Sequence, residues 1–372
     1  MISQRRRLGL IINPLAGIGG MVGLKGSDGA GTVREALALG AVPQAQGRAA
    51  EMLRQLVPLR GSLEIVTYPA EMGADQAKAC GFEPIVVGAI KPGATTGEDS
   101  RDAARELLER GVELLLFVGG DGTARDIYEA VGESLPVLGV PAGVKMHSSV
   151  YATSPRRAGD LVRDFLAGRA PVRPMEVMDI DEEKFRAGDV SAKLYGYLSI
   201  PFVASLLQGA KSASRSGAGD LATLARYVAQ QVDDDWRTIL GPGTTLREVA
   251  KELGVDKTLL GVDIVLRRAL IARDVNESEL LRIVDGNRCR IVVTVIGGQG
   301  FILGRGNQQL SPRVIRAVGL ENLLVVATVD KLVALSCPLR VDTGDTELDQ
   351  ELSGYRRVIT GSGEESIWRV AV

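Results

Sequence analysis

An apolar segment that ends in a glycine-rich loop constrains the fold of this chain more than any other feature. Residues 112–118 read VELLLFV, and a run with so few polar residues is typical of a central parallel strand buried on both faces. The loop GGDGT follows at 119–123, and a helix is predicted over 124–131. A buried strand that passes through a short loop into a helix is the repeating unit of α/β folds with a parallel sheet.

Strands and helices alternate along most of the chain. In the first 150 residues, the apolar pattern predicts strands at 8–12, 63–68, 84–88 and 137–140 and helices at 49–56 and 101–110. Between 172 and 200, two segments alternate apolar and polar residues as half-buried strands do. From residue 222 we predict helices near 222–232 and at 246–253, 277–284 and 312–317, and strands at 258–265, 290–295, 323–328 and 333–335.

We therefore expect an α/β protein with more than one domain. The length of 372 residues suits two or three domains, at roughly 150 residues each. We expect a parallel-sheet domain at 1–170, a β-rich connecting segment at 171–220 and a second α/β domain at 221–372.

Composition excludes several classes of function. The 44 lysine and arginine residues and 46 acidic residues leave a net charge of −2, so we do not expect a nucleic-acid partner. Aromatic residues make up 4% of the chain, too few for the stacking surfaces that bind single strands. One histidine and three cysteines far apart in the sequence do not predict a zinc site.

The same features bear on the compartment. Three dispersed cysteines favour a reducing cytoplasm over a disulfide scaffold. The first apolar run is about five residues long, too short for a signal peptide. No stretch approaches the roughly 20 apolar residues of a membrane span. We expect a cytoplasmic protein with no membrane partner.

The loop GGDGT has the composition of a phosphate site. Loops at the carboxyl ends of parallel strands line the ligand crevice. Consecutive glycines let backbone amides approach a phosphate, and the helix start adds positive charge. An acid in such a loop would repel phosphate, so Asp121 is predicted to contact a metal ion or to take a proton from an attacking hydroxyl. The alternative interpretation is a tight turn in which Asp121 caps the helix.

The common nucleotide-binding motifs are absent. A Walker loop needs a glycine directly before its lysine, but Lys25 follows Leu24 and Lys211 follows Ala210. The dinucleotide fingerprint GxGxxG is also missing, because Val22 occupies its last position after Gly17.

Several motifs resemble a known family. GGDGT at 119–123, together with INPLAG at 12–17, resembles the NAD kinase and diacylglycerol kinase superfamily, relatives of phosphofructokinase. Four further segments look like the AcoX-like branch of the ATP-NAD kinase family: GGMVGLKGSDG at 19–29, GVPAGVKMHSSVYA at 139–152, GPGTT at 241–245 and GGQGFILGRGNQQLSP at 297–312.

The resemblance implies an NAD-kinase-like donor domain in a phosphotransferase. It would use ATP, or another phosphoryl donor, with Mg²⁺ held through the phosphates rather than by protein ligands, and NAD is the favoured acceptor. Asp121 would act as the base on the 2′-hydroxyl of the adenosine ribose. The donor phosphates would lie against Asn13, Pro14, Gly17, Gly119, Gly120, Gly122 and Thr123. The chain departs from the family in lacking the Asn-Glu pair that grips the nucleotide, and in an α/β rather than all-β second half.

Candidate acceptor contacts lie in both halves. Lys145, His147, Ser148 and Ser149 follow the predicted strand at 137–140 and supply a cation, a switchable donor and hydroxyls. A lone histidine is more often structural than catalytic. Lys25 and Asp28 belong to a glycine-rich segment that reads as a lid or as a disordered surface loop. The remaining candidates are Asp126, Gly241, Gly243, Thr244, Thr245, Asp263, Gly298, Gln299, Arg305, Asn307 and Gln308.

The segment GGQGFILGRGNQQ at 297–309 has an alternative interpretation as a pair of ordinary tight turns. The expected protein is a two-lobed kinase whose partners are a nucleotide and a small-molecule substrate, and the superfamily favours a homo-oligomer. Two rival functions stay open. One is phosphorylation of another hydroxyl, on a sugar phosphate, a nucleoside or, least favoured, a lipid, because no basic amphipathic face is seen. The other is a nucleotide-sensing or regulatory protein without turnover.

Overall fold

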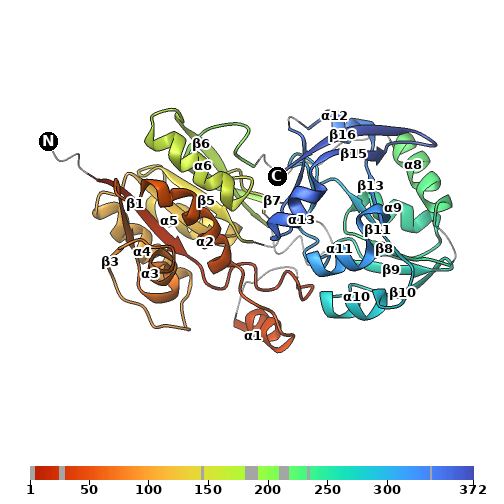
Figure 1. The fold of residues 1–372 in the computed structure, drawn as a ribbon, viewed down its shortest axis with the longest axis horizontal. Coiled ribbons are helices and arrows are strands. Elements are labelled where there is room, and N and C mark those ends of the chain that lie inside the picture. The colour runs from red at the N-terminus through yellow and green to blue at the C-terminus, as the bar shows by residue number, and fades with distance from the viewer. Residues whose placement is uncertain are drawn as a thin grey trace. The chain divides into compact units, whose positions relative to one another are not determined.

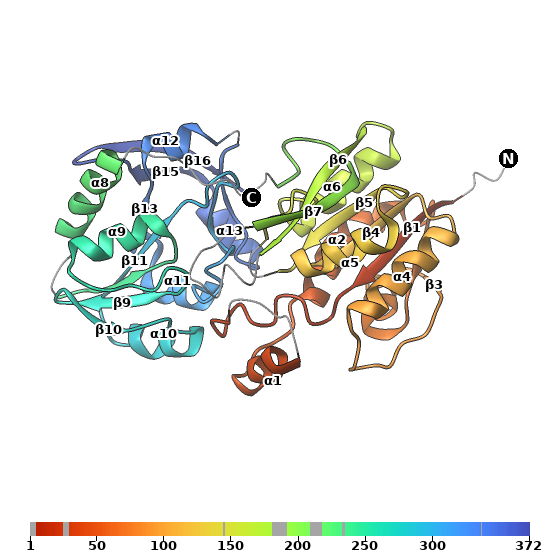
Figure 2. The same ribbon diagram turned by 180° about the vertical axis from the view of Figure 1, so that it is seen from behind.

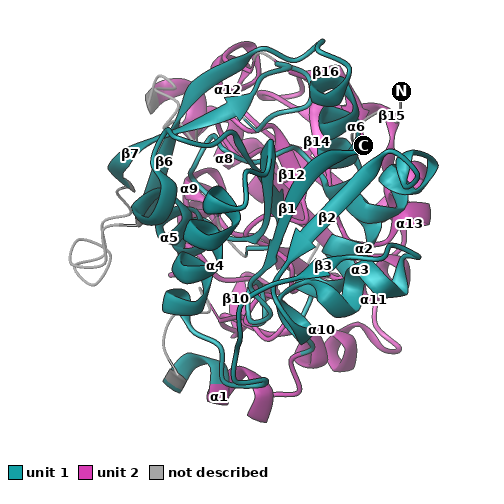
Figure 3. Cartoon of the chain, turned by 90° about the vertical axis from the view of Figure 1, so that its left-hand side faces the viewer, with its two compact units in different colours: residues 1–18, 27–33, 42–210 teal, residues 19–26, 34–41, 211–372 magenta. Residues whose placement is uncertain are grey.

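The computed structural model describes residues 5–24, 30–143, 146–180, 192–208, 218–232, 235–335 and 337–372. The chain divides into two compact units (Figures 1 and 3). Unit 1 comprises Met1–Ile18, Ser27–Val33 and Val42–Ala210, and unit 2 comprises Gly19–Gly26, Arg34–Ala41 and Lys211–Val372. The domain limits expected from the sequence stay a prediction.

Unit 1 is built on a parallel sheet of five strands in the order β3-β2-β1-β4-β5. Every residue of β4 is buried, as the apolar run at 112–118 predicts. β4 pairs in parallel with β1 on one side and β5 on the other. The strands are β1 (Arg6–Ile12), β2 (Leu63–Thr67), β3 (Ile85–Val86), β4 (Leu114–Gly119) and β5 (Val137–Pro141).

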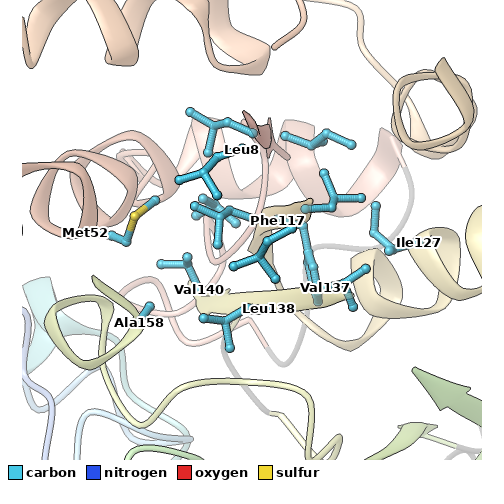
Figure 4. Close-up of a cluster of buried hydrophobic side chains, with 14 of the residues drawn as sticks. Leu8, Met52, Phe117, Ile127, Val137, Leu138, Val140 and Ala158 are labelled. Carbon is cyan, nitrogen blue, oxygen red and sulfur yellow. The ribbon is translucent and has the colours of Figure 1, made fainter. Parts of the chain in front are cut away.

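Helices cover both faces of this sheet (Figure 2). α2 packs with α6, and α4 packs with α5. Apolar side chains from the strands and from both helix pairs meet in one core (Figure 4). The helices are α2 (Ala45–Leu56), α3 (Ala74–Ala79), α4 (Gly97–Glu109), α5 (Asp121–Val131) and α6 (Pro155–Leu166), with single 3₁₀ turns at Val57–Leu59 and Ala70–Met72.

A long antiparallel hairpin completes unit 1. β6 (Val172–Ile180) pairs with β7 (Ala192–Pro201), in the region where the sequence alternates like half-buried strands. β6 packs against α5, and β7 packs against β5. The hairpin therefore lies beside α5, which begins at the glycine loop, and beside β5, the edge strand next to β4.

Unit 2 contains a mixed sheet of nine strands in the order β10-β9-β8-β11-β13-β15-β16-β14-β12. β8, β11, β13 and β15 run parallel, whereas β9, β10 and β16 pair antiparallel with their neighbours β8, β9 and β15. The strands are β8 (Arg237–Leu240), β9 (Asp263–Leu266), β10 (Ala269–Ala272), β11 (Cys289–Thr294), β12 (Phe301–Leu303), β13 (Leu323–Val326), β14 (Leu339–Val341), β15 (Gly354–Ile359) and β16 (Glu365–Ala371).

Alternate residues of these strands enter two separate cores. Ile239 packs with α10 and α11, whereas its neighbour Leu240 packs with α8 and α9. The helices are α8 (Ala218–Gln230), α9 (Thr244–Glu252), α10 (Glu277–Val284), α11 (Pro312–Val318), α12 (Val329–Val333) and α13 (Thr346–Leu352), with a 3₁₀ turn at Leu320–Asn322. α1 (Ala30–Ala38) contributes residues to both units. The expected α/β class of both halves is confirmed.

One predicted element is wrong. Residues 333–335 were expected to form a strand, but Val333 ends helix α12. The helix is only five residues long, so its apolar residues complete too few turns to show a helical period. The sequence also did not indicate α1, α3, α6 or α13, nor β8, β10, β12, β14, β15 and β16. Among the described residues, no helix is long and apolar enough to cross a membrane.

Candidate active site at the carboxyl ends of β1, β4 and β5

Three loops leave the same edge of the unit 1 sheet. They are the first loop (13–17) after β1, the segment 119–123, called the second loop, which runs from the last residue of β4 into the first turn of α5, and the third loop (142–148) after β5. Residues 144 and 145 of the third loop lie outside the described part. In the sheet, β2 lies next to β1 on the side away from β4, and β5 lies next to β4 on the side away from β1. The topological switch point is therefore between β1 and β4, where ligands bind in open α/β sheets.

Asn13 ties the first loop to the second. Its backbone N–H donates to the Val118 carbonyl at 3.0 Å, and its side-chain Nδ2 donates to Thr123 Oγ1 at 2.9 Å. Its Oδ1 accepts from the Leu15 N–H at 3.1 Å, so Pro14 lies within a side-chain-stabilised turn. The structure thus brings together Asn13, Pro14 and Thr123, which the sequence assigned to one phosphate site.

Gly17 lets the first loop pass directly against the third. Its φ is +75°, and an added Cβ would lie 2.0 Å from the Ala142 carbonyl oxygen. Any other residue at position 17 would force the two loops to move apart, because its side chain would be strained at this φ and would clash with the Ala142 carbonyl.

The second and third loops meet backbone to backbone. The Gly119 carbonyl accepts hydrogen bonds from the N–H groups of Ala142 and Gly143, at 3.0 and 3.1 Å. A Cβ on Gly143 would come within 2.7 Å of the Gly120 Cα. Gly120 is the N-cap of α5, whose first turn contains Gly122. The first N–H groups of a helix have no acceptor within it and attract anions.

Asp121 fastens the third loop to the start of α5. Its Oδ2 accepts from the His147 backbone N–H at 2.6 Å, and its Oδ1 accepts from the Ser148 N–H at 3.1 Å. The carboxylate is almost fully buried and also lies 3.3 Å from His147 Nδ1. α5 begins with no side-chain cap, so the alternative interpretation of Asp121 as a helix cap is not what the structure contains. Its role as a base stays a prediction.

Ser148 of the third loop and the next residue, Ser149, are buried and hydrogen-bonded. Ser148 Oγ donates to the Met178 carbonyl at 2.7 Å, and the Ser149 N–H donates to the Glu176 carbonyl at 3.0 Å. Both contacts fasten this loop to β6. Their side chains are nearly inaccessible, so the predicted contact of Ser148 with an acceptor would need the loop to open.

Two further residues hold the same loops and were missed by sequence reasoning. Tyr151 donates its hydroxyl to the Gly120 carbonyl at 2.5 Å, and Gln208 donates Nε2 to the Met146 carbonyl at 3.4 Å. Tyr151 lies within the family-like segment 139–152, which could have singled it out. Gln208 has no local signal, because only the fold brings it to residue 146.

Asp126 lies elsewhere on α5. Its carboxylate pairs with Arg101 of α4, and a Cβ on Gly97 of the same helix would lie 2.7 Å from it. Burial raises the pKa of Asp126 to about 6, although Arg101 and Arg125 oppose the change. The structure therefore places this predicted acceptor contact in the packing between α4 and α5, and none of the hydrogen bonds described for it reaches the described residues of the three loops.

In unit 2, the predicted loop 241–245 joins β8 to α9. Gly241 follows β8, Gly243 is the N-cap of α9 with φ of +118°, and Thr244 and Thr245 form its first turn. A Cβ on Gly243 would lie 3.0 Å from Thr294 at the end of β11. Thr294 accepts a hydrogen bond from the buried Lys331 at 3.3 Å. Sequence reasoning missed Lys331, because α12 was not recognised.

Asp263 is a structural carboxylate. It is fully buried and accepts from the N–H groups of Thr258 and Asp274, both at 2.6 Å. The ammonium of Lys257, also fully buried, lies 3.5 Å away. These partners fix the loop before β9 and occupy the carboxylate that was predicted to contact the acceptor.

The segment 297–312 is braced in a similar way. Arg305 forms a buried ion pair with Asp342 at 2.7 Å, and the Asn307 side chain bonds the Ile302 carbonyl and the Gly304 N–H, both at 2.9 Å. Gln308 lies against Gly20. Of the other candidates, Gln299 is buried and Gly298 has a positive φ, whereas Lys25, Asp28 and Lys145 lie outside the described residues.

The three loops offer one carboxylate to a metal ion. No group of three His, Cys, Asp or Glu residues that could hold a metal occurs in the described part of the chain. Asp121 is the one acid in the three loops. Mg²⁺ commonly takes one or two carboxylates, substrate phosphates and waters, so a single carboxylate is compatible with this ion.

Comparison with solved structures finds weak likenesses. Two are described as "a putative diacylglycerol kinase from Bacillus anthracis str. Sterne", at 14% and 12% identity and TM-scores of 0.27 and 0.26. These matches cover 48% and 63% of this chain but only 46% and 59% of those chains. A UDP-N-acetylglucosamine 2-epimerase matches at 10% identity, over 94% of this chain and 86% of that one, with a TM-score of 0.25. These scores are too low to support an argument.

No curated protein matches the sequence. Family models, in contrast, match both halves of the chain. The ATP-NAD kinase N-terminal domain matches residues 8–170, which contain all three loops. The ATP-NAD kinase C-terminal domain matches residues 233–370. The two matches together cover well over half of the sequence, and the chain belongs to the ATP-NAD kinase family.

Proposed function

We propose that this protein is an ATP-dependent small-molecule kinase that transfers a phosphoryl group to a hydroxyl of a nucleotide, with NAD as the favoured acceptor. The observation that carries the proposal is the convergence of the three loops at the switch point of the unit 1 sheet. The loop 119–123 there combines glycine backbone, a helix start and one buried acid. Family membership supports the same chemistry.

The donor phosphates would lie on the first and second loops. The N–H groups of the first turn of α5 have no acceptor within the helix, and the helix dipole favours negative charge at this end. The residues proposed to contact the phosphates are Asn13, Pro14, Gly17, Gly119, Gly120, Gly122 and Thr123. Mg²⁺ bound to those phosphates would neutralise charge that develops during transfer.

The acceptor hydroxyl would lie beside Asp121 and the third loop. Phosphoryl transfer depends mainly on positioning and electrostatics, because the transition state needs little covalent help. Asp121 holds His147 and Ser148 in place through backbone hydrogen bonds. Loss of this carboxylate is therefore expected to disturb the acceptor side, while the glycine backbone on the donor side is kept.

A transfer assay tests the proposal. The purified protein is given γ-labelled ATP, Mg²⁺ and NAD, and labelled NADP is the expected product. Asp121→Asn is expected to abolish transfer while ATP still raises the unfolding temperature. The asparagine side chain has one acceptor oxygen in place of two, so one of the backbone N–H groups of His147 and Ser148 loses its acceptor, at a cost of about 1–3 kcal/mol. The free energy of unfolding of this variant is therefore measured as well. Asp102→Asn, on the exposed side of α4, is the matched control.

Each result of the assay has a defined meaning. Label transferred to another hydroxyl compound, and not to NAD, would overturn the acceptor but keep the kinase. Dinucleotide binding without transfer to any acceptor would overturn the kinase and favour a nucleotide sensor. A fully active Asp121→Asn variant would remove Asp121 from the chemistry.

A further inference from the structure

The His147 ring makes one contact with Asp121 and leaves its other nitrogen without a described partner. The ring Nδ1 lies 3.3 Å from Asp121 Oδ2, the same oxygen that accepts from the His147 backbone N–H at 2.6 Å. The ring Nε2 is buried and has no hydrogen-bond partner among the described residues. His147 as a whole is 4% exposed, so an acceptor reaches Nε2, like Ser148, when the third loop opens.

The carboxylate of Asp121 selects which nitrogen carries the proton. An ionised carboxylate only accepts hydrogen bonds, so a neutral ring beside it holds its proton on Nδ1 and its lone pair on Nε2. The tautomer of a histidine is set in this way by the partner of its other nitrogen. His147 is thereby arranged as a proton acceptor at Nε2.

The burial of Nε2 indicates a polar partner outside the described residues. Buried polar atoms in folded proteins nearly always have a hydrogen-bond partner, and an exception asks for an explanation. A second such atom belongs to Gln208, which contacts Met146 of the third loop and whose Oε1 has no partner among the described residues. A polar ligand at this loop would satisfy such atoms, whereas a histidine that only braces the loop would be expected to use both nitrogens.

We propose that His147 is the catalytic base that accepts the proton of the acceptor hydroxyl, and that Asp121 is the positioning residue that orients the ring. This inference rests on the proposed kinase function. It assigns the proton to Nε2 of the ring instead of to the carboxylate of Asp121, whose two oxygens already accept backbone hydrogen bonds.

The proposed step moves one proton and one phosphoryl group. The O–H bond of the acceptor breaks and its proton moves to His147 Nε2. The acceptor oxygen forms a bond to the γ-phosphorus of ATP, and the bond from that phosphorus to the bridging oxygen breaks, so ADP leaves with the electron pair. The imidazolium is stabilised by the Asp121 carboxylate and then releases its proton to solvent.

Nuclear magnetic resonance tests the orientation without any activity. His147 is the one histidine of the sequence, so ring-¹⁵N histidine in the untagged chain gives signals from this residue alone. The expected result for the neutral ring is a proton on Nδ1, with that preference lost in Asp121→Asn. A proton on Nε2 in the wild type would overturn the inference.

Kinetics test the base. His147→Asn keeps an N–H donor near the position of Nδ1 and removes Nε2, so a merely structural role would survive this change. We expect kcat to fall by about 100- to 10,000-fold, with ATP binding retained, and we expect added imidazole to restore part of the activity of His147→Ala. Full activity of His147→Asn, in a preparation whose wild type transfers phosphate, would overturn the inference alone. A wild type that transfers to no acceptor would overturn the proposed function itself.

Discussion

Replacement of Asp126 by asparagine is expected to stabilise unit 1 at neutral pH, although it removes an ion pair with Arg101. Burial raises the pKa of this carboxyl from the ordinary value of 3.8 to about 6. The folded state therefore holds the proton to a higher pH than the unfolded state does. The stability that this proton contributes is present below about pH 4 and is lost as the pH rises through 6.

The size of the effect follows from the two pKa values. The gap between 3.8 and about 6, at about 1.4 kcal/mol per pH unit, corresponds to about 3 kcal/mol. Asparagine is neutral and nearly isosteric, so it avoids the cost of a buried charge at every pH. Arg101 keeps Glu98, at 2.6 Å, and Glu129, at 3.5 Å, as partners. At pH 7 the variant should be up to about 3 kcal/mol more stable than the wild type, and near pH 4 the two should be alike.

The assay must report on unit 1. Both tryptophans, Trp236 and Trp368, lie in unit 2, so tryptophan fluorescence follows the wrong unit. Hydrogen exchange of the buried β4 amides, measured between pH 4 and 7, gives the opening free energy of unit 1. Asp102→Asn on the same helix as Arg101 is the control and should show no such pH dependence. A variant that is less stable than the wild type at pH 7, or a difference that does not change with pH, would refute the reasoning.

Two further stability changes follow from the close contacts of each unit. Gly17→Ala should destabilise unit 1 by more than about 1–2 kcal/mol, because the methyl group would meet the Ala142 carbonyl at a φ of +75°. Hydrogen exchange of the β4 amides measures this change. The control Gly47→Ala, in open space on α2, should stabilise unit 1 by about 1 kcal/mol. Asp263→Asn should destabilise unit 2 by about 3–5 kcal/mol, because it removes the carboxylate that neutralises the buried Lys257 ammonium. Urea unfolding followed by tryptophan fluorescence measures the second change, and Asp256→Asn at the exposed Arg273 pair should have almost no effect.

The elements predicted well from the sequence are those with long, regular apolar patterns. β4 is buried throughout, and α10 runs over 277–284 as its pattern indicates, because each carries its own period or cap. Most of the elements that were missed or misassigned are short or lie near the ends of the chain, and α6, with 12 residues, is the exception. α12 has five residues and β12 has three, too few to distinguish the period of a helix from that of a strand.

The location of the candidate site could be predicted, but the partners of its residues could not. Loops after neighbouring parallel strands must emerge at one edge of a sheet, so the order of strands and glycine loops is enough to bring 13–17 and 119–123 together. Asp121 and Ser148, or Asp126 and Arg101, are about 25 residues apart, and their pairing depends on the packing of whole elements. Local sequence also gives no sign that Gly19–Gly26 belongs to unit 2, where the Met21 carbonyl accepts from the Glu277 N–H.

The central claim is that donor phosphates bind at the end of β4, on the loop 119–123. Hydrogen exchange with and without a non-hydrolysable ATP analogue and Mg²⁺ tests it most directly, because it reads the backbone amides that would hold the phosphates. We expect slower exchange at 119–124 and in the first loop at 13–17, with no change in the hairpin strand β10 of unit 2 at Ala269–Ala272. Protection confined to 241–245 in unit 2, or no protection of 119–124 at saturating analogue, would contradict the account.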